Sequence, residues 1–121
     1  MKNFKELLVW QKAINFVTII YKITDSFPES ERFGLINQLR RATVSIPSNI
    51  AEGCTRRSNI DFMQYLKIAR GSAAEVETQI IISYNLKFIN QNIYTELINQ
   101  IVEISKMLNG LISSLAKPTE D

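Results

Sequence analysis

The side chains that most often carry enzyme chemistry are scarce in this sequence. It contains no histidine and one cysteine, Cys54. The chain therefore lacks the usual general base near neutral pH, the commonest metal ligand and a partner to activate the thiol. One cysteine also excludes an internal disulfide and a cysteine-based zinc site. Glu75 and Glu77 are two residues apart, so on a helix they point to different faces and form no carboxylate pair. We expect no enzymatic activity, no cofactor and no metal.

Arginine is the one chemically informative side chain whose positions are clustered. All six arginines lie between residues 32 and 70, where seven basic and two acidic residues give a net charge of +5. The whole chain carries +2, so the remaining residues sum to −3. Exposed Arg and Lys side chains contact nucleic-acid phosphates without regard to base sequence. The predicted nucleic-acid-binding residues are Arg40, Arg41, Arg56, Arg57, Lys67 and Arg70.

A second interpretation uses the same arginines for assembly. Arg40, Arg41 and Arg70 would then form ion pairs with acidic residues of the same chain or of a neighbouring subunit. The acidic residues considered are Glu52, Glu75 and Glu77. Arg56 and Arg57 follow Gly53 in a predicted loop with no acid expected to neutralise them, which favours an exposed role in binding a partner. The alternative to nucleic-acid binding is therefore a purely structural or protein-binding oligomer.

Four segments have apolar residues spaced three and four apart, the period of an amphipathic helix. We expect helices over residues 4–24, 28–52, 59–88 and 92–116. Only four glycines and three prolines occur, and 45% of the 121 residues are apolar, which suits a few long elements around one core. Short connections make consecutive helices antiparallel neighbours. The prediction is an all-α fold, a single domain over residues 1–121, with an up-down-up-down four-helix bundle.

Local signals mark the ends of these helices. Ser26 and Glu29 have the spacing of a capping box for the second helix. Pro47 lies inside that helix and removes one backbone hydrogen bond, which predicts a kink near residues 43–47. Gly53 is expected to end it. Ser58 is the expected N-cap of the third helix.

The first helix is apolar over about 200° of its circumference, because two stripes run along it. One stripe contains Leu7, Trp10, Ile14, Val17 and Tyr21, and the other contains Val9, Ala13, Phe16, Ile20 and Ile23. A helix this apolar must be buried on more than one side, so we expect copies of the chain to associate.

The second helix also carries a polar seam, which suits either a buried hydrogen-bonded contact or a solvated face. The residues predicted to lie between subunits are Val9, Phe16, Ile20, Ser45 and Asn49. If Val9, Phe16 and Ile20 are enclosed within a single chain, this expectation of assembly loses its basis.

Several motifs together resemble a known family. They are WQKA at residues 10–13, FPESERFGL at 27–35, QLRRATVSIPSNIAEG at 38–53 and IARGSAAEVETQI at 68–80. In this order and spacing they are similar to the four-helix-bundle proteins, also called 23S rRNA intervening-sequence proteins. The resemblance covers nearly the whole chain. It implies an antiparallel four-helix bundle that assembles as a ring-shaped homopentamer, and no established enzymatic activity.

A related branch implies possible partners. The accessory variability proteins of diversity-generating retroelements form a basic pentameric barrel that binds nucleic acid and works with a reverse transcriptase. By this resemblance, RNA, DNA or a reverse-transcriptase-like protein are expected partners, beside further copies of the chain.

The N-terminal residues lack the apolar region and the cleavage site of a secretory signal. No apolar run approaches the roughly 20 residues that span a bilayer. We expect a cytoplasmic protein with no membrane partner.

Overall fold

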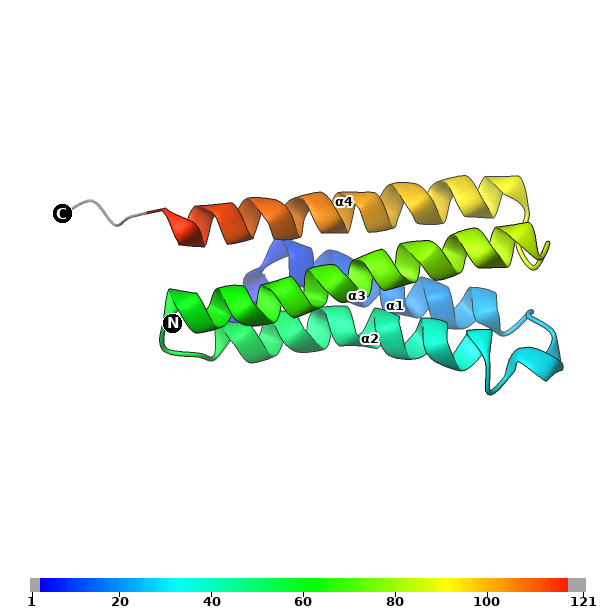
Figure 1. The fold of residues 1–121 in the computed structure, drawn as a ribbon, viewed down its shortest axis with the longest axis horizontal. Coiled ribbons are helices and arrows are strands. Elements are labelled where there is room, and N and C mark those ends of the chain that lie inside the picture. The colour runs from blue at the N-terminus through cyan, green and yellow to red at the C-terminus, as the bar shows by residue number, and fades with distance from the viewer. Residues whose placement is uncertain (1–2, 118–121) are drawn as a thin grey trace.

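The protein, described here over residues 3–117 by a computed structural model, folds as four α-helices, with no strand in this part of the chain (Figure 1). The helices are α1 (Leu8–Thr24), α2 (Leu35–Cys54), α3 (Asn59–Asn85) and α4 (Gln91–Ala116). Two short 3₁₀ helices precede α1 and α2, η1 (Phe4–Glu6) and η2 (Glu29–Glu31). The predicted all-α fold with four helices is confirmed. None of the helices within residues 3–117 combines the length and apolar character of a transmembrane span.

The core is built from one apolar stripe of each helix, as the 3.6-residue period predicts. α2 packs extensively on α3, and α3 on α4, whereas α1 packs mainly on α2 and only lightly on α4. The largest fully buried side chains are Phe16, Ile20, Leu39, Ile46, Ile50, Leu66, Val76, Ile80, Leu97, Ile101, Ile104 and Leu108. Burying a side chain of this size contributes about 1.5–3 kcal/mol to folding, so these residues are the main source of the bundle's stability.

The prediction that Val9, Phe16 and Ile20 lie between subunits is wrong. Their exposed fractions are 4%, 0% and 0%, because this stripe of α1 faces the core of its own chain. The other stripe of α1 is left outside only in part: Ile14 is 38% exposed and Tyr21 is 41% exposed, whereas Leu7 and Trp10 pack against the core. The expectation of assembly therefore loses the basis it was given, because Val9, Phe16 and Ile20 are enclosed within one chain. The exposed apolar residues of this arc belong to the other stripe, a different set from the one predicted.

The second helix begins seven residues later than predicted, at Leu35. Ser26 does not cap it, because its hydroxyl donates to the Ile23 carbonyl at 2.8 Å and so closes the end of α1. Phe27 is buried and packs against the Phe88 ring at 5.3 Å, which draws the connection back onto the bundle. The Glu31 carboxylate instead accepts from the Leu35 N–H at 3.2 Å and satisfies the first turn of α2.

α2 passes through Pro47 and Gly53 without interruption and ends at Cys54. The kink predicted near Pro47 stays a prediction. The expectation that Gly53 ends the second helix is wrong, because the helix continues to Cys54. Gly53 instead allows α2 to approach α3 closely. A Cβ atom at Gly53 would lie 2.7 Å from the Tyr65 Cβ and 2.9 Å from the Phe62 Cδ1. Glycine is needed there because two helix backbones meet.

The termini of α3 and α4 depend on local capping. The Ser58 Oγ accepts from the Asp61 N–H at 3.1 Å, which confirms the predicted N-cap of α3. α3 ends at Asn85 rather than 88, since Lys87 adopts a positive φ of 65° and turns the chain towards α4. The Asn90 side chain caps α4 through the Ile93 N–H at 2.8 Å.

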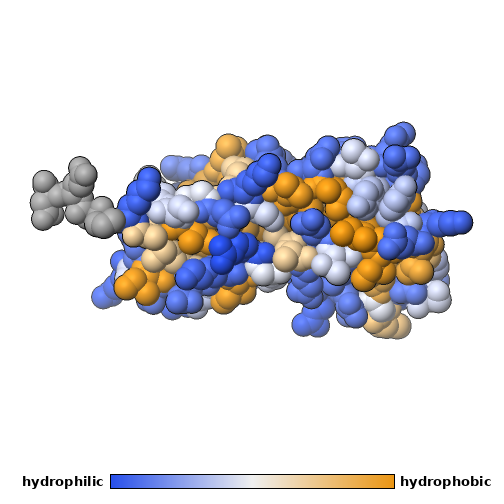
Figure 2. Space-filling model, turned by 45° about the horizontal axis from the view of Figure 1, so that its top comes forward, coloured by the Kyte–Doolittle hydropathy of each residue, from blue (hydrophilic) through white to orange (hydrophobic). Residues whose placement is uncertain are grey.

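Large apolar side chains also remain on the surface of α3 and directly after it. Ile68 is 52% exposed and Ile82 is 42% exposed on α3, and Leu86, the residue that follows α3, is 52% exposed. Figure 2 shows apolar patches on the face that it presents, separated by hydrophilic side chains.

Candidate nucleic-acid interface

Of the six predicted phosphate-binding cations, Arg40 forms its hydrogen bonds and ion pair within its own chain. Its Nε donates to the Thr24 Oγ1 at 2.9 Å, and one Nη donates to the Tyr21 carbonyl at 3.2 Å and the Asp25 carboxylate at 3.0 Å. The guanidinium also lies 4.5 Å from the centre of the Tyr21 ring. Arg40 is thus ion-paired as the second interpretation expected, but with Asp25, an acid that it did not consider.

Arg56 is also engaged within the chain, contrary to the prediction that no acid neutralises it. One Nη donates to the Glu52 carboxylate at 2.8 Å and to the Tyr65 hydroxyl at 2.6 Å. The guanidinium lies 4.8 Å from the centre of the Tyr65 ring. Glu52 precedes Arg56 by four residues, a spacing at which helix neighbours pair, because the helical geometry of α2 extends close to Arg56.

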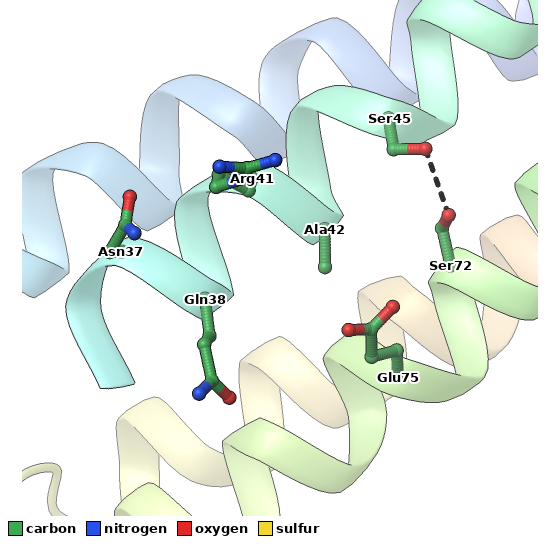
Figure 3. A pocket seen from close by; sticks show the side chains of 7 residues that line it. All are labelled: Asn37, Gln38, Arg41, Ala42, Ser45, Ser72 and Glu75. Atoms are coloured by element: carbon green, nitrogen blue, oxygen red, sulfur yellow. Dashed lines mark hydrogen bonds between the residues drawn. The ribbon is translucent and has the colours of Figure 1, made fainter. Parts of the chain in front are cut away.

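Arg41 lies at a polar groove between α2 and α3, shown in Figure 3. The groove encloses about 360 Å³. Glu75 lines the opposite wall from α3, but Arg41 and Glu75 form no ion pair in the described chain. Asn37, Gln38 and the hydroxyls of two serines complete the polar lining.

The predicted interface residues Ser45 and Asn49 form hydrogen bonds within the chain. The Ser72 hydroxyl donates to the Ser45 Oγ at 2.9 Å, which joins α3 to α2 (Figure 3). The Asn49 amide donates to the Ser45 carbonyl at 2.8 Å and to its Oγ at 2.9 Å. Both residues are half-buried. Ser45 and Asn49 therefore belong to a hydrogen-bonded network on α2 that reaches α3 through Ser72.

The remaining cations are exposed. Arg70 donates to the Asn109 side chain of α4 at 3.0 Å and forms no ion pair with the described residues. Arg41, Arg57 and Lys67 make neither an ion pair nor a side-chain hydrogen bond within residues 3–117. Arg41 follows the start of α2, Arg57 lies in the α2–α3 connection, and Lys67 and Arg70 lie on α3. Four of the six predicted cations are thus exposed and have no ion pair within residues 3–117.

Several residues of these networks were not predicted from the sequence. The Glu52–Arg56 pair has a local signal in its four-residue spacing. Thr24, Asp25 and Asn109 have none, because Arg40 follows Asp25 by 15 residues and Asn109 follows Arg70 by 39. Contacts over such separations depend on how the helices pack.

Comparison with known proteins gives a family and a fold. The model of the 23S rRNA-intervening sequence protein family matches residues 5–110. No curated protein matches the chain. A crystal structure from Bacteroides thetaiotaomicron, described as a protein of unknown function from the S23 ribosomal protein family, superposes with a TM-score of 0.81 at 28% identity. The match covers 88% of this chain and 96% of that one. The chain therefore belongs to the 23S rRNA-intervening sequence protein family.

Proposed function

We propose that this protein is a non-catalytic, homo-oligomeric scaffold of the cytoplasm that binds RNA or DNA, or a partner that processes nucleic acid. The observation that carries the proposal is the group of exposed cations between residues 41 and 70 that have no acidic partner in the described chain: Arg41, Arg57, Lys67 and Arg70. These residues lie on one helix pair and its connection, where ring assembly would repeat them once per subunit. Repeated positive charge attracts a polyanion more strongly than one copy does.

For this scaffold we propose an up-down-up-down bundle, in which consecutive helices run in opposite directions. Contacts between α3 and α4 support it, because Tyr84 stacks on Tyr94 at 4.3 Å whereas Arg70 reaches Asn109. Residues earlier in α3 thus lie beside residues later in α4, as in an antiparallel pair. α2 and α3 behave in the same way, since Ser45 meets Ser72 and Arg56 meets Tyr65.

Self-association is proposed to use an apolar groove between α1 and α2. Its lining combines the outward stripe of α1 with α2, and its volume is about 290 Å³. Trp10, Ile14 and Val17 line it from α1, and Val44 and Pro47 line it from α2. A ring-shaped homopentamer, the assembly implied by the family resemblance, would cover this groove in every subunit.

The test of nucleic-acid binding is a titration of labelled single-stranded RNA and duplex DNA at several salt concentrations. We expect affinity that falls steeply with salt, because binding to phosphates releases condensed counterions. The triple variant Arg41→Gln/Arg57→Gln/Lys67→Gln should weaken binding and reduce the slope of log K against log salt by about 2–3, since each lost phosphate contact removes about 0.7 for single strands and about 0.9 for duplex DNA.

The matched control removes three other exposed lysines, Lys5→Gln/Lys22→Gln/Lys106→Gln, and so changes the net charge by the same amount. It should keep most of the native slope. Equal losses in the two triple variants would show that only net charge matters, and absence of binding at low salt would reject the proposal.

A second candidate function is a purely structural or protein-binding oligomer. It is favoured by two ion pairs within the chain, in which the guanidinium groups of Arg40 and Arg56 bind Asp25 and Glu52. This alternative predicts an intact oligomer that binds neither RNA nor DNA at low salt.

A further inference from the structure

A further cavity lies at one end of the bundle and shares no lining residue with the groove of Figure 3. It encloses about 590 Å³ between the start of the chain, the α2–α3 connection and the last turns of α4. Small-molecule sites typically enclose about 300–1,000 Å³. The volume therefore suits a small ligand.

The cavity arises because the helices differ in length. α1 has 17 residues, whereas α3 has 27 and α4 has 26. At the end where α1 begins, α3 and α4 extend beyond it (Figure 1). η1 occupies part of this space and packs on α1 and α2. The end of α4 is therefore left without a full helix opposite it.

The floor of the cavity is apolar. The apolar stripe of α4 that is buried at Leu108 continues to Leu111 and Leu115, which are only partly buried and line the cavity. Leu7 and Phe62 complete the apolar lining from the start of the chain and from α3. Covering such side chains with a hydrocarbon group removes apolar surface from water and is favourable.

The rim of the cavity is cationic. Arg56 and Arg57 line it, and no acidic residue does. Arg56 is neutralised by Glu52, whereas Arg57 has no ion pair or side-chain hydrogen bond within residues 3–117. A guanidinium with five donors binds a carboxylate in a two-pronged hydrogen-bonded pair.

From the apolar floor and the one unpaired cation beside it, we propose that this cavity binds a small amphipathic anion, a molecule with a hydrocarbon tail and a carboxylate head. The tail lies against Leu111, Leu115 and Phe62, and the head meets Arg57. Ser114, which is exposed and also lines the cavity, offers a hydroxyl donor beside the same opening. The inference shares Arg57 with the proposed nucleic-acid surface, but its apolar half, formed by Leu111, Leu115 and Phe62, is separate from those cations, and decanoate binding is measured without nucleic acid.

The test uses the 121-residue protein in its native assembly state, with decanoate as the ligand and the fluorescent anion 1-anilinonaphthalene-8-sulfonate as the displaced probe. We expect saturable displacement by decanoate. Arg57→Gln should weaken decanoate about fivefold to tenfold, because it removes charge-assisted hydrogen bonds. Octan-1-ol, which carries no charge, should displace the probe equally from the native protein and from Arg57→Gln.

A second variant fills the cavity without removing a core residue. Ser114→Phe should abolish saturable displacement while leaving the helical circular-dichroism signal and nucleic-acid binding unchanged. The control Arg32→Gln removes an exposed arginine at the opposite end of α2 and should match the native protein. Absence of saturable displacement in the native protein, or native affinity in both Arg57→Gln and Ser114→Phe, would overturn the inference and leave the nucleic-acid proposal untouched.

Discussion

Gly53 and Gly71 show that the same residue type has opposite roles in two helices. Gly53 is buried where α2 meets α3, and an added Cβ would lie 2.7 Å from the Tyr65 Cβ. Gly71 is exposed in the middle of α3, and an added Cβ there would meet nothing within 4 Å. Only the first position needs glycine for packing.

We predict that Gly53→Ala destabilises the protein by about 1–3 kcal/mol, the usual cost of overpacking a helix contact. Gly71→Ala serves as its control and should stabilise by about 0.5–1 kcal/mol, because alanine restricts the unfolded chain and favours the helix. Urea unfolding monitored by circular dichroism measures both. Two shifts of the same sign would contradict this account of the α2–α3 contact.

The end of α1 is joined to α2 by the Arg40 side chain. Its guanidinium bonds three residues of the α1 terminus, and the side chain is only 26% exposed. η2 and the connection between the helices lie beside this contact. Arg40 therefore fixes the position of one helix end rather than offering a free charge.

Replacing Arg40 with methionine should cost about 1–2 kcal/mol of unfolding free energy, since the Tyr21 carbonyl and Thr24 hydroxyl lose a charged donor. Arg32→Met breaks an exposed pair with Glu29 and should change stability by less than about 0.5 kcal/mol. Thermal unfolding of the two variants separates these effects. A native midpoint for Arg40→Met would mean that the contact contributes little to the bundle.

At the scale of the whole molecule, the outward stripe of α1 and the groove beside it are the strongest structural support for assembly. Ile14 and Val44 each remain 38% exposed on the two walls of this groove. An apolar groove between two long helices is the kind of surface that a second copy covers.

We predict that the native protein has a multiple of the single-chain mass in light scattering. Ile14→Asp/Val44→Asp should reduce the measured mass to that of one chain, because two carboxylates would be buried without partners. Its helical signal should persist, since neither residue belongs to the buried core. Ile60→Asp replaces a 68% exposed isoleucine in the first turn of α3 and should leave the mass unchanged. A native protein with the mass of one chain would refute assembly through this groove.

Much of the fold follows from residues close together in the sequence. The 3.6-residue apolar period determined that four helices form, and the spacing of Ser58 and Asp61 determined where α3 begins. The absence of histidine likewise excluded histidine-dependent chemistry from the composition alone. These features depend on backbone geometry over one or two turns, which the local sequence encodes.

Tertiary structure decided which of these local patterns faced inward and which side chains met. Either apolar stripe of α1 could have faced the core, and packing chose the one with Phe16 and Ile20. Arg40 could have been exposed, yet its guanidinium on α2 pairs with the Asp25 carboxylate at the end of α1. The cavity beside Arg57 exists because α1 is shorter than α3 and α4. Such contacts join residues far apart in the chain, so their geometry is set only when the helices pack together.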